Sequence, residues 1–299
     1  MKNYVSIDIG GTAIKYGVLD EKGYILEHDQ MDTEASLGGP SILLKAVGIV
    51  ERYREKYEIC GICISTAGMV DTKKGEIIYS GPQIPDYIGT AFKQTMEDKF
   101  QVPCEVENDV NCAGLSEHVS GAAKGSSVTL CLTIGTGIGG CMVIGGQVFH
   151  GHSNSACEVG YMRVADGQEF QNLGSASALC RRVTERKEKE GIAGKWNGYQ
   201  IFLAAKAGDV ICIEEIDRMV DILGEGIANI CYVMNPQVVV LGGGIMAQKE
   251  YLLPKFRDSL RKYLLPSIAE KTVLKVAEHG NRAGMLGAFY HFKRMQKEQ

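Results

Sequence analysis

A glycine-rich strand-turn-strand pattern occurs twice in the chain, and this repetition restricts the fold more than any other feature of the sequence. The first copy lies at residues 8–12 (DIGGT) and the second at residues 133–140 (TIGTGIGG). Apolar, β-branched runs typical of strands flank both copies, and segments of helical periodicity follow each. Because solenoids need three or more repeats, two copies indicate a duplicated domain. The pattern predicts an α/β fold of two similar domains with a ligand bound in a central cleft.

The length and the charge of the chain narrow the function classes. The 299 residues exceed what one hydrophobic core usually organises, so we place a small N-terminal lobe at residues 1–115 plus 283–299 and a larger lobe at residues 116–282. The formal net charge of −4 argues against a nucleic-acid partner. The opening run MKNYVSIDIG has no signal-peptide core, and no apolar run approaches the roughly 18–20 residues that span a bilayer. We therefore expect a cytoplasmic protein with neither a nucleic-acid nor a membrane partner.

Ten cysteines raise the question of a metal site. Cys60 and Cys63 form a C-x-x-C pair inside the apolar run CGICIS, which predicts a buried strand. Side chains three residues apart on a strand point to opposite faces, so this pair cannot grip one ion. The other eight stand singly among apolar residues, where free cysteine behaves as a small hydrophobe. The sequence predicts buried free thiols, as expected in a reducing compartment.

The first glycine turn is a candidate phosphate loop. Gly10 and Gly11 let backbone N–H groups approach an anion, and Thr12 adds a hydroxyl donor. Asp8, at the end of the preceding strand, could hold a hydrated Mg²⁺ beside the phosphates. Lys15 could neutralise phosphate charge, although a surface lysine on the second strand is an equal alternative. The alternative for the whole motif is a tight hairpin, for which two glycines suffice.

The second glycine turn is richer than a hairpin requires, with four glycines and two threonines in eight residues. The surplus indicates close approach of the backbone to a ligand. Its candidate phosphate-binding residues are Thr133, Gly135, Thr136, Gly137 and Gly139. Gly243 and Gly244 follow the strand VVVL and would leave a flat surface where a nucleoside could lie, although a helix-entry turn is the alternative.

The run Glu107-Asn108-Asp109 stands between a predicted strand and a predicted helix. A carboxylate in this position could accept a proton from an attacking hydroxyl, and Asn108 could hydrogen-bond the neighbouring hydroxyls of a sugar. Helix capping is the alternative, and in isolation the motif favours it, because Asn and Asp are among the best caps.

Six segments together resemble the ROK family (repressors, open reading frames and kinases), and they cover essentially the whole chain in the family's order. They are residues 8–12, 65–68, 107–109, 133–140, 158–160 and 241–244. The ordered set is far more specific than any single segment. The resemblance implies an actin-like, ribonuclease-H-like pair of domains with ATP in the cleft. It also implies ATP and Mg²⁺ as cofactors, and a homodimer.

The resemblance also implies roles for individual residues. Asp109 matches the family's catalytic base, while Gly68, Asn108 and Glu158 match its sugar-binding positions. The phosphate-binding segments correspond to Asp8 with the turn at residues 10–12, and to residues 135–139. Gly243 and Gly244 lie where the family places adenosine.

The chain departs from the family where the family binds zinc. Tyr161 replaces the ligand histidine, and residues 162–174 contain none of the family's cysteines, so we predict no zinc site. Gln171 stands where the family often has a sugar-binding glutamate, so Tyr161 and Gln171 would change the pocket near the anomeric end of the sugar. His150 and His152, which we expect on one strand face, could chelate only weakly, and we expect them to be exposed or hydrogen-bonded.

These features predict a kinase that transfers the γ-phosphoryl group of ATP to a hydroxyl of a hexose or hexoside, by family analogy the 6-hydroxyl. A glucokinase-like or β-glucoside kinase activity is the first hypothesis, and an N-acetylmannosamine kinase is an alternative. A non-enzymatic sugar-sensing regulator of the same family is the alternative from another class. Such regulators carry an N-terminal helix-turn-helix, for which a phosphate loop beginning at residue 8 leaves no room.

Overall fold

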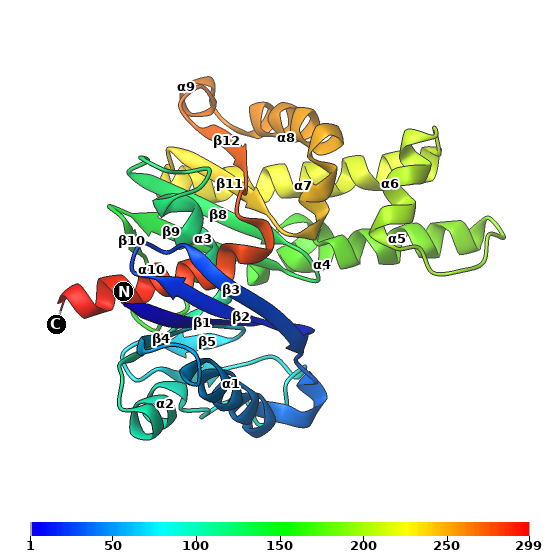
Figure 1. Cartoon of the computed structure of the whole chain (residues 1–299). Coiled ribbons are helices and arrows are strands. Elements are labelled where there is room, and N and C mark those ends of the chain that lie inside the picture. Colours follow the sequence, from blue (N-terminus) through cyan, green and yellow to red (C-terminus); the bar gives the residue numbers. More distant parts are fainter. Residues whose placement is uncertain (1, 299) are drawn as a thin grey trace. The chain divides into compact units, whose positions relative to one another are not determined.

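The computed structural model describes residues 2–298, and its internal contacts divide the chain into two compact units (Figure 1). Unit 1 comprises the chain up to Gly121, the segment Gly146–Ala156 and the chain from His279 onward. Unit 2 comprises Ala122–Gly145 and Cys157–Glu278. Segment 146–156 thus groups with unit 1, whereas the sequence boundaries assign it to the larger lobe. Within the described residues, no helix combines the length and the apolar character needed to cross a bilayer.

Unit 1 is built on a five-stranded sheet with the order β3-β2-β1-β4-β7. Its strands are β1 (Asn3–Ile9), β2 (Ala13–Asp20), β3 (Ile25–Asp32), β4 (Ile59–Thr66) and β7 (Cys104–Asn108). β2 runs antiparallel to β1 and β3, whereas β4 and β7 run parallel to β1. β4 is almost wholly buried, because helices cover both faces of the sheet there. A separate two-stranded sheet joins β5 (Met69–Asp71) to β6 (Glu76–Tyr79).

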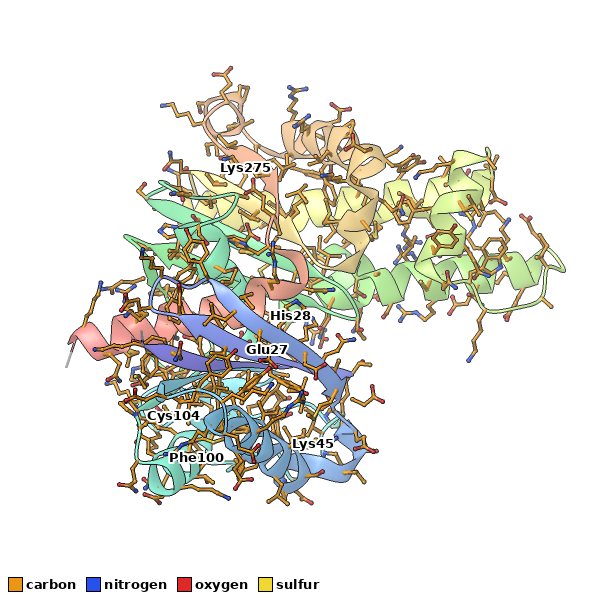
Figure 2. All side chains as sticks on the ribbon, viewed as in Figure 1. Glu27, His28, Lys45, Phe100, Cys104 and Lys275 are labelled. Atoms are coloured by element: carbon orange, nitrogen blue, oxygen red, sulfur yellow. The ribbon has the colours of Figure 1, made fainter. Side chains whose placement is uncertain are left out.

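Two pairs of helices sandwich this sheet. α1 (Gly38–Arg54) and α2 (Phe92–Phe100) pack their apolar stripes on one face. α3 (Asp109–Val119) and α10 (Ala283–Glu298) pack on the other, where Cys63 and Cys112 contact residues of α10. Figure 2 labels Phe100 and Cys104, the residues where α2 ends and β7 begins. The β7–α3 junction is therefore held between the sheet and α10.

Unit 2 repeats the topology of unit 1. Its strands β8 (Val128–Ile134), β9 (Ile138–Ile144), β11 (Val238–Gly242) and β12 (Val273–Val276) lie in the order β9-β8-β11-β12. β9 is antiparallel to β8, whereas β11 and β12 continue parallel to it, as β4 and β7 continue from β1. This shared order confirms the duplicated α/β domain that the two glycine turns predict.

The helices of unit 2 bury one large apolar core against this sheet. They are α4 (Phe170–Gly174), α5 (Ala176–Lys189), α6 (Gly198–Lys206), α7 (Val210–Met234), α8 (Lys249–Tyr263) and α9 (Pro266–Ala269). Capping residues fix where they start: Asn197 and Gln200 form a capping box on α6, and the Asp209 side chain accepts from Cys212 N on α7.

The structure tests two further predictions from the sequence, one on the cysteines and one on His150 and His152. All ten cysteines are free, and Cys60 and Cys63 lie on β4 as predicted. Seven are buried, whereas Cys60, Cys157 and Cys180 are only partly buried, so the prediction of buried thiols is wrong for these three. The expectation that His150 and His152 share a strand face is wrong, because β10 (Gln147–Val148) ends before them. Gly151, between the two histidines, has a φ of 69°, a left-handed conformation in which a strand cannot continue.

Candidate active site

Asn108 joins the end of β7 to the start of α3 and uses both ends of its side-chain amide. It is the N-cap of α3, and its Oδ1 accepts hydrogen bonds from the backbone N–H groups of Val110 (2.9 Å) and Asn111 (3.0 Å). Its Nδ2 donates to the Gly68 carbonyl oxygen (2.9 Å) and to Asp109 Oδ1 (3.1 Å). The capping interpretation is thus confirmed, and the same side chain also contacts Gly68 and Asp109, two other residues of the predicted site.

Asp109 is the first residue of α3 and is partly exposed. Its Oδ1 accepts from the backbone N–H of Val110 (2.9 Å) as well as from Asn108 Nδ2. A helix N-terminus favours a negative charge at this position. The two bonds to one oxygen fix the orientation of the carboxylate, as a general base requires.

Gly68 is a glycine for reasons of backbone geometry. Its φ is 93°, and a Cβ there would lie 2.7 Å from the Tyr79 carbonyl oxygen. The turn presents the Gly68 carbonyl to Asn108. The structure therefore brings together three of the predicted site residues, Gly68, Asn108 and Asp109, within unit 1.

Glu107 lies directly beneath this turn and is fully buried. Its Oε1 accepts from Asn108 N–H (2.8 Å) and Asn111 Nδ2 (3.1 Å), and its Oε2 lies 2.6 Å from His150 Nε2 and 3.5 Å from His291 Nδ1. Burial by itself would raise the pKa of Glu107, but the hydrogen bond from His150 and the charges of the two histidines outweigh it, so the pKa lies below its ordinary value. Glu107 is therefore a buried carboxylate in its ionised form.

Asp8 ends β1 in unit 1, where Ser65 Oγ donates to its Oδ1 (2.7 Å). A Cβ at Gly284 of α10 would overlap the carboxylate, so α10 needs a glycine there. Burial raises the pKa of Asp8, and the Ser65 hydrogen bond and the charge of Lys15 offset only part of that shift. A nearby cation would favour the ionised form.

A magnesium ion fits this carboxylate only as a largely hydrated ion. Among the described residues, no group of three or more His, Cys, Asp or Glu side chains is arranged to hold a metal. Mg²⁺ commonly keeps several waters and is shared between one or two carboxylates and substrate phosphates. Asp8 suits that role, and in the described part of the chain no such group of side chains lies near Tyr161 either.

The first glycine turn uses one of its amides for its own hairpin. Gly10 N–H donates to the Ala13 carbonyl (3.1 Å), and the Gly10 carbonyl accepts from Thr33 Oγ1 (2.6 Å). Gly11 is exposed, and a Cβ there would meet nothing within 4 Å. The hairpin interpretation thus holds for Gly10, and the loop would bind phosphate through Gly11 and Thr12.

Lys15 lies directly across from Asp8 in the β1–β2 pairing. Its Nζ is 3.5 Å from Asn281 Oδ1, and the side chain is partly exposed. The lysine is therefore both a surface residue and the cation beside Asp8.

The second glycine turn opens onto a cavity of about 570 Å³ within unit 2. The cavity is lined largely by apolar side chains of α5 and α6, together with residues of the turn and of the chain after β11. Its lining includes Gly135, Thr136, Leu179, Tyr199, Phe202 and Gly244. Its size and character match a site for a nucleoside-sized ligand. Three of the predicted nucleotide-binding residues, Gly135, Thr136 and Gly244, thus share one cavity.

Gly243 has a structural reason to be glycine. Its φ is 91°, and a Cβ there would overlap the backbone of Ile134 at the end of β8. Gly244, in contrast, has open space where a Cβ would be. The pair lets the chain pass close to the end of β8 and then line the cavity.

Glu158 precedes a 3₁₀ turn, Val159–Tyr161, in unit 2, and Tyr161 is the last residue of that turn. Both residues are exposed, although burial of part of its carboxyl raises the pKa of Glu158. Gln171 Oε1 lies close to Gly137 and Gly160. A Cβ added at Gly137 would be 2.9 Å from this oxygen, and a Cβ added at Gly160 would be 3.0 Å from it. Gln171 thus packs against both the second glycine turn and the 3₁₀ turn.

Sequence reasoning missed the two histidines on Glu107. His150 comes from a segment 43 residues further along, and His291 comes from α10. Neither stands in a motif, so no local signal could have paired them with Glu107.

Comparison with known proteins agrees with this geometry. The ROK family pattern matches residues 4–295. An uncharacterised protein of Clostridium perfringens is 50% identical over 292 residues, which cover 97% of each chain. A β-glucoside kinase of Klebsiella pneumoniae is 32% identical over 299 residues, covering 98% of this chain and 96% of the relative.

A solved structure gives the same result. The crystal structure of a ROK family glucokinase from Streptomyces griseus, in complex with glucose and AMPPNP, matches with a TM-score of 0.82 at 27% identity, covering 97% of this chain and 98% of that one. The fold is the actin-like α/β fold of the ROK sugar kinases, as the sequence predicts. The chain belongs to the ROK family.

Proposed function

We propose that the protein is an ATP-dependent sugar kinase that transfers the γ-phosphoryl group of ATP to the 6-hydroxyl of a hexose or hexoside. The observation that carries the proposal is the turn at Asn108 and Asp109, where an asparagine orients a carboxylate at a helix N-terminus. The glucose and AMPPNP bound by the Streptomyces griseus glucokinase support the two substrate classes.

Asp109 acts as the general base in this proposal. Its carboxylate binds the acceptor hydroxyl of the sugar and takes the proton as the sugar oxygen attacks the γ-phosphorus. Asn108 is already committed to Gly68 and Asp109 through its Nδ2, so its main contribution is to hold the base in place. In phosphoryl transfer such positioning accounts for much of the acceleration.

The nucleotide is bound by two sets of residues. The adenosine lies in the cavity lined by Gly135, Thr136 and Gly244, whose apolar walls suit a purine. Gly11 and Thr12 of the first turn donate to phosphate oxygens, and Asp8 holds the water shell of Mg²⁺. When bound, Mg²⁺ neutralises charge on the β- and γ-phosphates.

The sugar specificity follows from Glu158, Tyr161 and Gln171. An uncharged phenol and an uncharged amide stand where the family resemblance leads one to expect a histidine and a glutamate near the anomeric end. A site without those partners gains little from a free anomeric hydroxyl and loses little when that hydroxyl is substituted. We therefore propose β-glucosides as substrates beside free hexoses, in keeping with the β-glucoside kinase among the relatives.

A coupled ADP-release assay tests this function. The panel contains glucose, N-acetylmannosamine, fructose, cellobiose and an aryl β-glucoside, with ATP and Mg²⁺ in excess. We expect ADP release that depends on the sugar, with a β-glucoside or glucose as the best substrate and ³¹P NMR of the product showing a 6-phosphate. ADP release that is the same without any sugar, or absent with every sugar, would overturn the proposal.

A further inference from the structure

We propose that Glu107 and His150 are positioning residues that hold the Asn108–Asp109 turn in its productive geometry, an inference that rests on the proposed kinase function. In this arrangement His150 clamps one oxygen of Glu107, and the other oxygen of Glu107 fixes the start of α3. The proposal gives segment 146–156, which contains His150, a part in the reaction although it touches no substrate.

The two carboxylate oxygens of Glu107 have separate partners. Oε1 accepts from the Asn108 backbone N–H and from the Asn111 amide, both in the first turn of α3. Oε2 faces His150 and His291. Because the Asn108 N–H has this carboxylate as its acceptor in the interior, a displaced Glu107 would leave a buried donor unpaired. The position of the turn therefore depends on the position of Glu107.

His150 is the member of this cluster that solvent can reach. Its side chain is 26% exposed, against 1% for Glu107 and 4% for His291. Its backbone carbonyl accepts from Ala156 N–H (3.1 Å), which closes the loop that carries it. A substitution at His150 thus tests the clamp without emptying the core, whereas a substitution at Glu107 or His291 would disturb packing as well.

The pKa values of the two histidines are shifted in opposite directions. Burial would lower the pKa of His150, but its hydrogen bond and attraction to Glu107 outweigh burial, and the pKa lies above its ordinary value. Burial lowers the pKa of His291, and its Nε2 has no hydrogen-bond partner among residues 2–298. Glu107 thus favours the cationic form of His150, whereas burial favours the neutral form of His291.

Other charged groups near the cluster also affect the protonation of the two histidines. Arg294 of α10 opposes protonation of both histidines. Glu105 of β7 favours it at His291, but its own carboxylate is bonded by Lys93 (2.9 Å) and Gln296 (2.9 Å). His118 of α3 has its pKa lowered by burial and by Arg294, so it adds little charge. Glu107 remains the principal partner of His150.

The direction in which kcat changes with pH follows from the raised pKa of His150. The cationic form of His150 is complete below its ordinary pKa of roughly 6.5 and is lost as the pH rises through the higher value in the folded protein. A neutral imidazole still donates one hydrogen bond to Glu107, but it lacks the charge attraction that the cationic form adds. The wild-type kcat should therefore decline by about two- to fivefold on the alkaline side.

The experiment compares kcat and KM across pH 5.5–9 in the full-length wild type and in His150→Phe, His150→Gln and His152→Gln. His152 is exposed and lies two residues from His150, which makes it the matched control. We expect His150→Phe to lower kcat about 10- to 100-fold, since misplacement of a catalytic group by about 1 Å has effects of this size. KM for ATP should stay within about twofold of wild type.

The conservative variant separates positioning from packing. His150→Gln keeps a donor near the place of Nε2, so it should retain most of kcat at pH 7 and lose the alkaline decline. His152→Gln should match wild type throughout. Wild-type kcat in His150→Phe, or equal losses in the His150 and His152 variants, would overturn the proposal while leaving the kinase function intact.

An imidazole NMR titration keeps the inference testable if the wild type phosphorylates no sugar. We expect the His150 resonance to titrate above its ordinary pKa in the wild type and to move down in Glu107→Gln, with circular dichroism checking that the variant is folded. If Glu107→Gln does not fold, the wild-type titration alone decides. A wild-type His150 that titrates at or below its ordinary value would contradict the clamp, whichever way the activity assay turns out.

Discussion

The two glycine hairpins share one backbone plan but carry different side chains at equivalent positions. In unit 1, Asp8 of β1 pairs across the sheet with Lys15 on β2 and with Ser65 on β4. A carboxylate, an ammonium group and a hydroxyl therefore meet at the end of that strand. This hairpin has the chemistry to handle a hydrated cation and phosphate charge.

In unit 2 the corresponding positions carry almost no side chain. Thr133 of β8 pairs with Gly139 on β9 and with Gly242 on β11. Gly139 and Gly242 bring no side chains to this strand end, and Gly135 and Thr136 of the turn line the 570 Å³ cavity. The two hairpins thus occupy equivalent positions in the duplicated topology. The first carries charged and polar side chains, whereas the second carries glycines and lies beside a cavity.

Among changes to the two hairpins, the largest effect is expected from removing the charge of the first. Asp8→Asn should lower kcat at least about 100-fold, because the water shell of Mg²⁺ loses its carboxylate. Thr133→Val, the equivalent change in the second hairpin, should lower kcat by less than about tenfold. Steady-state kinetics with a Mg²⁺ titration measures both, and equal losses in the two variants would erase the distinction between the hairpins.

The same substitution should stabilise the protein when no nucleotide is present. Because burial raises the pKa of Asp8, the folded state binds its proton more tightly than the unfolded chain does, so the free energy of unfolding falls as the pH rises past about 4. At neutral pH, Asp8→Asn removes that penalty. We expect a higher thermal midpoint than wild type at pH 7.5, by calorimetry, and a gap that closes toward pH 4.

The close approach behind the second hairpin should make Gly243 far less tolerant than its neighbour. Gly243→Ala meets the Ile134 backbone at a positive φ and should lower the free energy of unfolding by about 3 kcal/mol. Gly244→Ala, the matched control with open space, should stay within about 0.5 kcal/mol. Urea denaturation distinguishes them, and similar values would mean that the chain after β11 can relax.

Filling the cavity of unit 2 should weaken nucleotide binding alone. Gly244→Val has room for its side chain only inside the cavity, so KM for ATP should rise about tenfold with kcat and the sugar KM little changed. Gly48→Val on α1, where a Cβ also meets nothing, is the control and should leave both KM values unchanged. A rise in the sugar KM instead would assign the cavity to the other substrate.

Lys15 should have the smallest effect. Lys15→Gln leaves a slightly shorter polar side chain and removes a partly exposed charge beside Asp8. We expect a two- to fivefold loss of kcat/KM for ATP that shrinks at high salt, because ions screen exposed charges. A loss above about 50-fold would give Lys15 a direct role in the transfer.

The local motifs of the site were predictable because each is set by neighbouring residues. The glycine turns, the cap at Asn108 and the strand after residue 60 follow from spacing and residue type within short windows. The repeat predicted the duplicated domain for the same reason. Such signals depend on backbone geometry, which short stretches of sequence specify.

The support beneath the site was not predictable, because it comes from distant segments. Glu107 has histidines from segment 146–156 and from α10, and the Asp8 carboxylate needs Gly284 beside it. His150 was misplaced onto a strand, because nothing in the run QVFH marks Val148 as the end of β10. Only the fold shows which distant residues meet.

Turnover of Asp109→Asn tests the central claim most directly, since everything proposed for the site depends on a carboxylate that accepts the proton of a sugar hydroxyl. The amide keeps the shape and the acceptor oxygen of Asp109, so sugar binding by calorimetry should stay within a few-fold of wild type. We expect kcat to fall by about 10²- to 10⁴-fold. A variant that binds sugar normally and turns over at close to the wild-type rate would contradict the account.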